Sequence, residues 1–150
     1  MTIQENLIRQ TIIEHYEHPK NKVANSFIKK NKDYAKGHSD SPSCIDNIDS
    51  FVKIKNDKII DVKFAGVGCA ICTSSTDLMA IELTNKPLKQ AKSIINNYLA
   101  MIKNDKYHEK NVKKLIFFKN VNKQPNRIKC ATTGILAISK AIDNYEKSKK

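Results

Sequence analysis

The sequence lacks tryptophan, has only two arginines, and contains no apolar run near the roughly 18 residues that a membrane-spanning helix needs. We therefore expect no membrane contact. The first residues, MTIQENLIRQ, carry charges where a secretory signal needs an apolar core, which predicts a cytoplasmic protein. With 150 residues, of which 40% are apolar, the chain has the size of a single domain covering residues 1–150.

The net charge of +12 comes almost entirely from 25 lysines. Lysine-rich proteins often bind nucleic acid, because lysines neutralise phosphates. Here the lysines are spread along the chain and few aromatic residues alternate with them to stack on bases, so we expect no nucleic-acid partner. The lysine-rich run from Lys103 to Lys123 is most simply a solvated surface, and docking to an acidic partner is the alternative.

The apolar pattern predicts an amphipathic helix over residues 2–17, which His18-Pro19 ends. A long polar loop follows over residues 19–47, with one short strand near residues 33–36. Residues 49–68 alternate on both sides of Asn56-Asp57, which is a β-hairpin signal.

Three helices are expected after the hairpin. They cover residues 70–84, residues 87 to about 103, and residues 128 to about 146. A helix, a short sheet and then several helices predict an α+β domain.

Four cysteines in a cytosolic chain of this size favour metal binding or catalysis over disulfides. Cys44 lies in the loop before the hairpin, Cys69 follows the hairpin at a helix start, and Cys130 is expected in the first turn of the last helix. Asp46 is two residues after Cys44. Zn²⁺ takes four such donors in a tetrahedron, so Cys44, Asp46, Cys69 and Cys130 could form one complete site.

Other interpretations stay open at this point. Cys69-Ala-Ile-Cys72 could be a redox dithiol, although no βαβ pattern surrounds it. Cys72 could replace Asp46 in a closed Cys₄ zinc site, or the cysteines could be inert core thiols. The histidines have no support as ligands, and we expect His15 and His18 on the surface. His38 is the best outside candidate, because its loop precedes Cys44.

The motifs DSPSCID, FAGVGCAICTSST and PNRIKCATTGILAI, in this order, resemble the three cysteine motifs of the IscU/SufU (NifU N-terminal-like) family of iron–sulfur cluster assembly proteins. The stretch IIEHYEHPKN resembles the family's first helix and the loop after it. The resemblance covers nearly the whole chain. It implies a small antiparallel three-stranded sheet packed against several helices.

The resemblance is closest to the SufU type. The 60 residues between Cys69 and Cys130 include the extra segment of SufU-like proteins. Lys129 stands where the IscU type has histidine, and Arg127 matches an arginine of the SufU type. The prolines of the chaperone-recognition segment of the IscU type are missing from QPNRIKC.

The resemblance implies a function in sulfur transfer. SufU-like proteins bind zinc, here through Cys44, Asp46, Cys69 and Cys130, and act with a pyridoxal-phosphate (PLP) cysteine desulfurase. The persulfide sulfur of that enzyme passes to Cys44, after a ligand from the desulfurase has replaced Cys44 on zinc. The sulfur then goes to downstream iron–sulfur assembly proteins. The alternative is a scaffold that builds a [2Fe-2S] cluster on the same ligands, since thiolates suit both metals.

Two residues depart from the family pattern. Ile45 stands where the family has glycine, which could reshape the loop and makes Asp46 a less secure ligand than the cysteines. Cys72 replaces a serine, and could be a spare ligand, a sulfur relay or an oxidation liability.

Overall fold

A computed structural model describes residues 2–42 and 45–149. The helices and strands, in chain order, are α1 (Ile3–Glu17), α2 (Phe27–Lys30), β1 (Ala35–Asp40), β2 (Asn47–Lys55), β3 (Lys58–Val67), α3 (Ala70–Leu83), α4 (Leu88–Ile102), the 3₁₀ segments η1 (Glu109–Asn111) and η2 (Lys113–Lys123), and α5 (Pro125–Ser148).

The three strands form one antiparallel sheet in the order β1-β2-β3, so the predicted α+β fold with a small three-stranded sheet is confirmed. The β2–β3 turn has positive φ at both central residues, 53° at Asn56 and 57° at Asp57. These values match a type I′ turn, whose twist fits a two-residue hairpin. The predicted strand near residues 33–36 is β1, which begins at Ala35 and runs on to Asp40.

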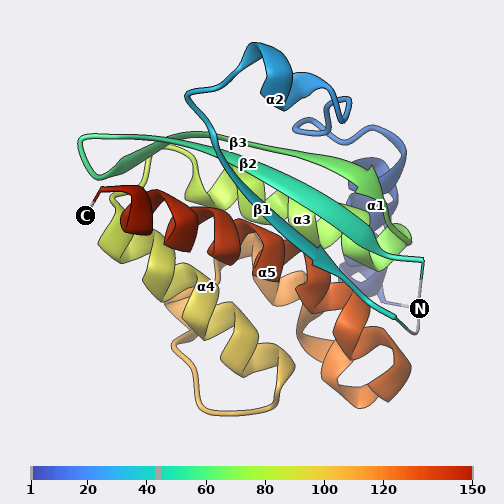
Figure 1. The fold of residues 1–150 in the computed structure, drawn as a ribbon. Coiled ribbons are helices and arrows are strands. Elements are labelled where there is room, and N and C mark those ends of the chain that lie inside the picture. Colours follow the sequence, from blue (N-terminus) through green and yellow to red (C-terminus); the bar gives the residue numbers. More distant parts are fainter. Residues whose placement is uncertain (1, 43–44, 150) are drawn as a thin grey trace.

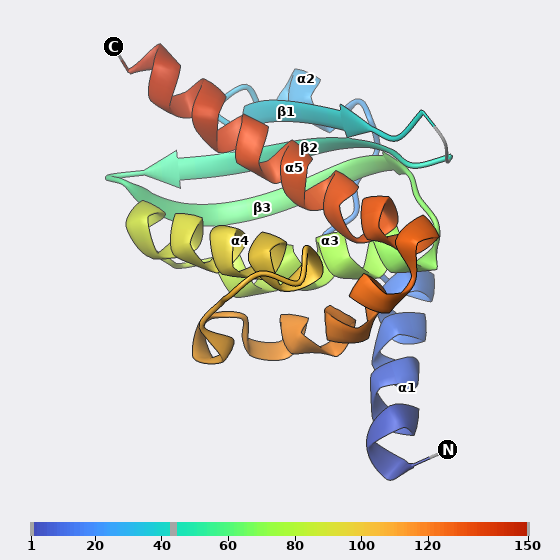
Figure 2. The same ribbon diagram turned by 90° about the horizontal axis from the view of Figure 1, so that it is seen from below.

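Helices cover one face of the sheet, and the other face is only partly covered (Figures 1 and 2). Helices α3 and α5 pack on one face, and α4 and η2 complete the core behind them. The short helix α2, which the sequence pattern did not predict, lies over the other face (Figure 1), where the rings of Phe27 and Phe51 are 5.6 Å apart. Among the described residues, no helix has the length and apolarity needed to cross a bilayer.

Helix α5 lies unusually close to its neighbours because two glycines face them. A Cβ atom at Gly37 of β1 would stand 2.1 Å from the carbonyl oxygen of Ala137. A Cβ atom at Gly134 of α5 would stand 1.6 Å from Oγ1 of Thr76 on α3. Real Cβ atoms do not approach other atoms this closely, so both contacts require glycine.

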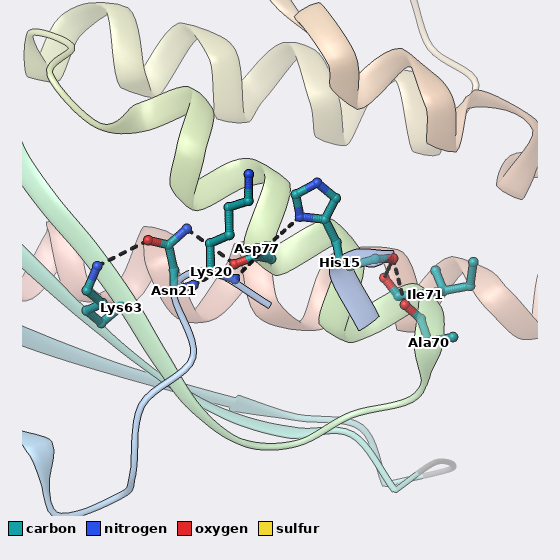
Figure 3. Close-up of polar contacts among 8 residues, drawn as sticks. His15, Lys20, Asn21, Lys63, Ala70, Ile71 and Asp77 are labelled. Atoms are coloured by element: carbon teal, nitrogen blue, oxygen red, sulfur yellow. Dashed lines mark hydrogen bonds and ion pairs between the residues drawn. The ribbon is translucent and has the colours of Figure 1, made fainter. Parts of the chain in front are cut away.

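A fully buried carboxylate joins α1 to the rest of the molecule (Figure 3). Asp77 of α3 pairs with Nδ1 of His15. It also accepts hydrogen bonds from the backbone N–H groups of Lys20, at 3.1 Å, and Asn21, at 2.8 Å, and from the Asn21 side chain. Lys63 of β3 donates in turn to the Asn21 side chain. Asp77 therefore fixes both the end of α1 and the chain that leaves it.

The surface placement predicted for His15 is wrong, because only 8% of this residue is exposed. Its ring turns inward to Asp77, which lies 62 residues away in the chain. A histidine near the end of an amphipathic helix is normally on the surface, so only the position of its distant partner explains this burial.

We expect Asp77→Ala to destabilise the protein by about 3–5 kcal/mol, because it leaves several donors without an acceptor at once. His15→Ala should cost only about 1–2 kcal/mol, since three N–H donors still satisfy the Asp77 carboxylate. Urea unfolding of both variants measures this difference. Equal losses would show that the ion pair, rather than the backbone bonds, carries the stabilisation.

Candidate metal centre

Three of the four proposed ligands meet at one end of the sheet. One donor atom from each of Asp46, Cys69 and Cys130 lies within 4.8 Å of the other two. The register of the β2–β3 hairpin explains why Asp46 and Cys69 are close. Asn47 and Val67 are direct partners at the end of the hairpin. Asp46 immediately precedes Asn47, and Cys69 is two residues after Val67. The fourth, Cys44, lies outside the described residues.

Asp46 is buried, with 1% of its surface exposed. Its Oδ1 accepts a hydrogen bond of 2.9 Å from the backbone N–H of Cys69. Its Oδ2 lies 4.0 Å from the Cys69 sulfur. One oxygen is thus fixed by the backbone while the other faces the thiols, an orientation that suits a carboxylate donating one oxygen to a metal.

The neighbouring isoleucine does not move Asp46 out of the site. Ile45 is 67% exposed, whereas Asp46 is buried beside Cys69. The predicted reshaping of the loop therefore still leaves the carboxylate in position to act as a ligand.

Cys69 is the N-cap of α3, and its sulfur accepts the N–H of Cys72 at 3.4 Å. A helix N-terminus concentrates partial positive charge and free N–H groups, which favour a negative sulfur. The predicted position of Cys69 at a helix start is confirmed.

Cys130 lies in the second turn of α5, because this helix begins at Pro125 rather than near Ile128. The predicted first-turn position is therefore wrong. Burial raises the pKa of the Cys130 thiol, and the adjacent Cys69 and Asp46 raise it further. A positive charge between these groups would favour the ionised form of the Cys130 thiol.

The donor set fits a divalent metal ion. Two thiols and a carboxylate are donors that Zn²⁺ accepts, and a cation would offset the repulsion between their charged forms. Clustered thiols could also ligate iron, so the donors alone do not identify the metal.

Cys72 lies outside this cluster. It is fully buried in an apolar group with Ile48, Phe64 and Ala137. Burial raises the pKa of its thiol, and Asp46 and Cys69 add to the shift. Because its side chain packs among apolar residues and lies outside the metal-ligand cluster, the geometry disfavours the Cys₄ site. Its burial also makes it a slow redox partner, which disfavours the redox dithiol.

His38 is engaged elsewhere: its Nδ1 pairs with Asp49 at 2.8 Å, and it is absent from the metal-ligand cluster among the described residues. The sequence did not point to Asp77, although the cluster depends on its helix. One signal for a buried acceptor was present in the sequence. The turn HPKN, residues 18–21, has polar groups with no evident partner nearby in the chain.

Comparison with known proteins identifies the family. The sequence profile described as NifU-like N terminal domain matches residues 7–150. The chain belongs to this family. The chain is also 31% identical over 144 residues to the zinc-dependent sulfurtransferase SufU of Bacillus subtilis, covering 95% of this chain and 93% of that protein. The resemblance inferred from the cysteine motifs is confirmed.

Other relatives include proteins described as scaffolds. The iron–sulfur cluster assembly scaffold protein IscU of Streptococcus pyogenes is 33% identical over 103 residues, 68% of this chain and 65% of IscU. A crystal structure of an iron–sulfur cluster assembly scaffold protein for the SUF system of Fervidobacterium islandicum superimposes with a TM-score of 0.79 at 25% identity, covering 87% of this chain and 92% of that one. The relatives of this chain thus include both a protein named as a sulfurtransferase and proteins named as scaffolds.

We expect purified wild-type protein to hold one zinc ion, and Asp46→Ala to bind it far more weakly. The loss of zinc affinity should exceed the roughly 10- to 100-fold loss that is typical when a residue that only orients a metal ligand is removed. Cys72→Ser should retain zinc, because Cys72 is outside the cluster. Native mass spectrometry of anaerobically prepared protein measures both. Zinc that survives Asp46→Ala but not Cys72→Ser would contradict this ligand set.

Proposed function

We propose that this protein is a zinc-dependent sulfur acceptor and carrier for iron–sulfur cluster assembly. The observation that supports it most directly is the cluster of Asp46, Cys69 and Cys130, in which Asp46 and Cys130 are buried and Cys69 is half-buried. Similarity to the SufU sulfurtransferase over nearly the full length of both chains supports the same function. The partners we propose are a PLP-dependent cysteine desulfurase and downstream iron–sulfur assembly proteins.

In this proposal Cys44 completes the ligand set, because it lies two residues before Asp46 in the sequence. When bound, Zn²⁺ supplies the positive charge that favours thiolates over thiols. Asp46 is the weakest donor of the set, and its Oδ1 already accepts a hydrogen bond from the backbone N–H of Cys69. A site with one weak donor suits ligand exchange better than four thiolates do.

The transfer itself is a thiol–persulfide exchange. The thiolate of Cys44 attacks the outer sulfur of the desulfurase persulfide, forming a new S–S bond. The sulfur–sulfur bond in the desulfurase breaks, and its electron pair leaves on the desulfurase cysteine as a thiolate. Electrons balance within the exchange, so no external oxidant or reductant is required.

A cluster scaffold is the second candidate, favoured by similarity to the IscU scaffold protein. The two functions predict different cargo on the same residues. Iron and sulfide with little zinc in the anaerobically purified protein would favour the scaffold. Zinc without iron would favour the carrier.

We expect a cysteine desulfurase, supplied with cysteine, to add one sulfur atom to Cys44. Alkylation followed by peptide mass spectrometry locates the added sulfur. Cys44→Ser should abolish it and slow cysteine turnover, because the acceptor is gone. Cys72→Ser is the matched control and should accept sulfur normally. Sulfur found on Cys72, or unchanged turnover with Cys44→Ser, would contradict the assignment.

A further inference from the structure

An apolar groove lies between α1 and the 3₁₀ segment η2, outside the metal-ligand cluster. Its volume is about 380 Å³. Ile8, Ile12 and Ile13 of α1 line one wall, Phe117 and Val121 of η2 line the other, and Ile71 of α3 lies between them. A groove of this size accommodates a few apolar side chains.

Helix α1, which forms one wall of the groove, projects beyond the body of the molecule. Figure 2 shows its N-terminal half projecting away from the sheet and from the other helices. Ile13, which lines the groove, is 41% exposed, whereas Ile3 and Leu7 are exposed on the opposite side of the helix. Apolar side chains that recur at helical spacing on a projecting helix are typical of a surface that binds another protein.

Lysines flank the opposite wall, whose own groove-lining residues are uncharged. Side chains three residues apart lie above one another in a 3₁₀ helix, and Phe117 and Asn120, which both line the groove, have this spacing. The same spacing places Lys114 before this pair and Lys123 after it. Both lysines are exposed. One row along η2 therefore has a positive charge at each end and groove-lining residues between them.

These charges are not neutralised within the described part of the chain. Residues 103–129 contain eight lysines and one arginine against two acidic residues, and all nine cationic side chains are exposed. None of the nine takes part in the ion pairs found among the described residues, which involve other lysines and histidines. A partner with negative charge is the complement to such a surface.

We propose that the groove binds an acidic amphipathic helix of a partner protein. Apolar side chains on one face of that helix would enter the groove, and carboxylates beside them would face Lys114 and Lys123. Both walls of the groove are helical and offer no strand edge. The occupant must therefore satisfy its own backbone hydrogen bonds, as a helix does.

The groove adjoins the metal-ligand cluster. Ile71 is two residues after Cys69, and Gln124, which also lines the groove, immediately precedes the helix of Cys130. A bound helix would thus lie beside the cluster. The inference goes beyond the proposed function, since it requires neither zinc nor sulfur transfer.

A fluorescent synthetic peptide tests the proposal. The peptide carries leucines at helical positions i, i+3, i+4 and i+7 and glutamates at the others, and its anisotropy reports binding to the full-length protein. We expect Lys114→Glu with Lys123→Glu to weaken binding about tenfold or more at low ionic strength, and less at high ionic strength. Ile13→Ser should weaken it at both ionic strengths, because it removes apolar contact.

The matched control is Lys103→Glu with Lys106→Glu, which makes the same change in net charge outside the groove lining. At low ionic strength it should weaken binding clearly less than the Lys114 and Lys123 changes do, and at high ionic strength it should leave the affinity within about twofold of wild type. An equal loss in the control would overturn the proposal, because net charge alone would explain the binding. Absence of peptide binding to wild type would also overturn it.

A second arm separates protein from nucleic acid. A single-stranded oligonucleotide that binds more tightly than the peptide and loses affinity with the Lys114 and Lys123 variants would overturn the proposed partner class. Thermal unfolding of each variant checks folding, and Lys114→Gln with Lys123→Gln replaces any that is unfolded. Zinc content, measured in parallel, should be unchanged, so failure here is distinguishable from failure of the proposed sulfur chemistry.

Discussion

The contact between Gly134 and Thr76 is the constraint on which the candidate site depends. It lets α5 approach α3 more closely than any side chain at residue 134 would allow. Thr76 is buried without polar cost, because its hydroxyl donates to the Cys72 carbonyl of its own helix. Since Cys69 caps α3 and Cys130 is one turn before Gly134, the contact also sets how close the two sulfurs come.

Much of this arrangement could be predicted from the sequence, and the reasons are local. Asn56-Asp57 accepts positive φ, so the hairpin and its register follow from a few residues. Apolar periodicity predicted α1, α3 and α4 to within a few residues. The motifs led to the family, and thereby to a ligand set that periodicity alone could not have distinguished from other cysteine arrangements.

The misses have physical causes as well. α2 has only four residues, too few for a periodic signal, and η2 follows a three-residue period that an α-helical pattern does not detect. The start of α5 was placed three residues late, although Pro125 suits the first turn of a helix. The burial of His15 depends on Asp77, which is distant in the sequence and whose position only the tertiary fold determines.

The first turn of α3 connects the features that matter for function. Cys69 begins it and faces Asp46 and Cys130, Ile71 turns to the groove beside α1, and Cys72 turns into the core. The four residues from Cys69 to Cys72 thus reach the cluster, the apolar groove and the core. A partner helix in the groove would contact the turn that holds the Cys69 sulfur, so docking and ligand exchange could be coupled through one rigid element. Asp77, one turn further along the core side of α3, anchors the same helix to α1, which forms the other wall of the groove.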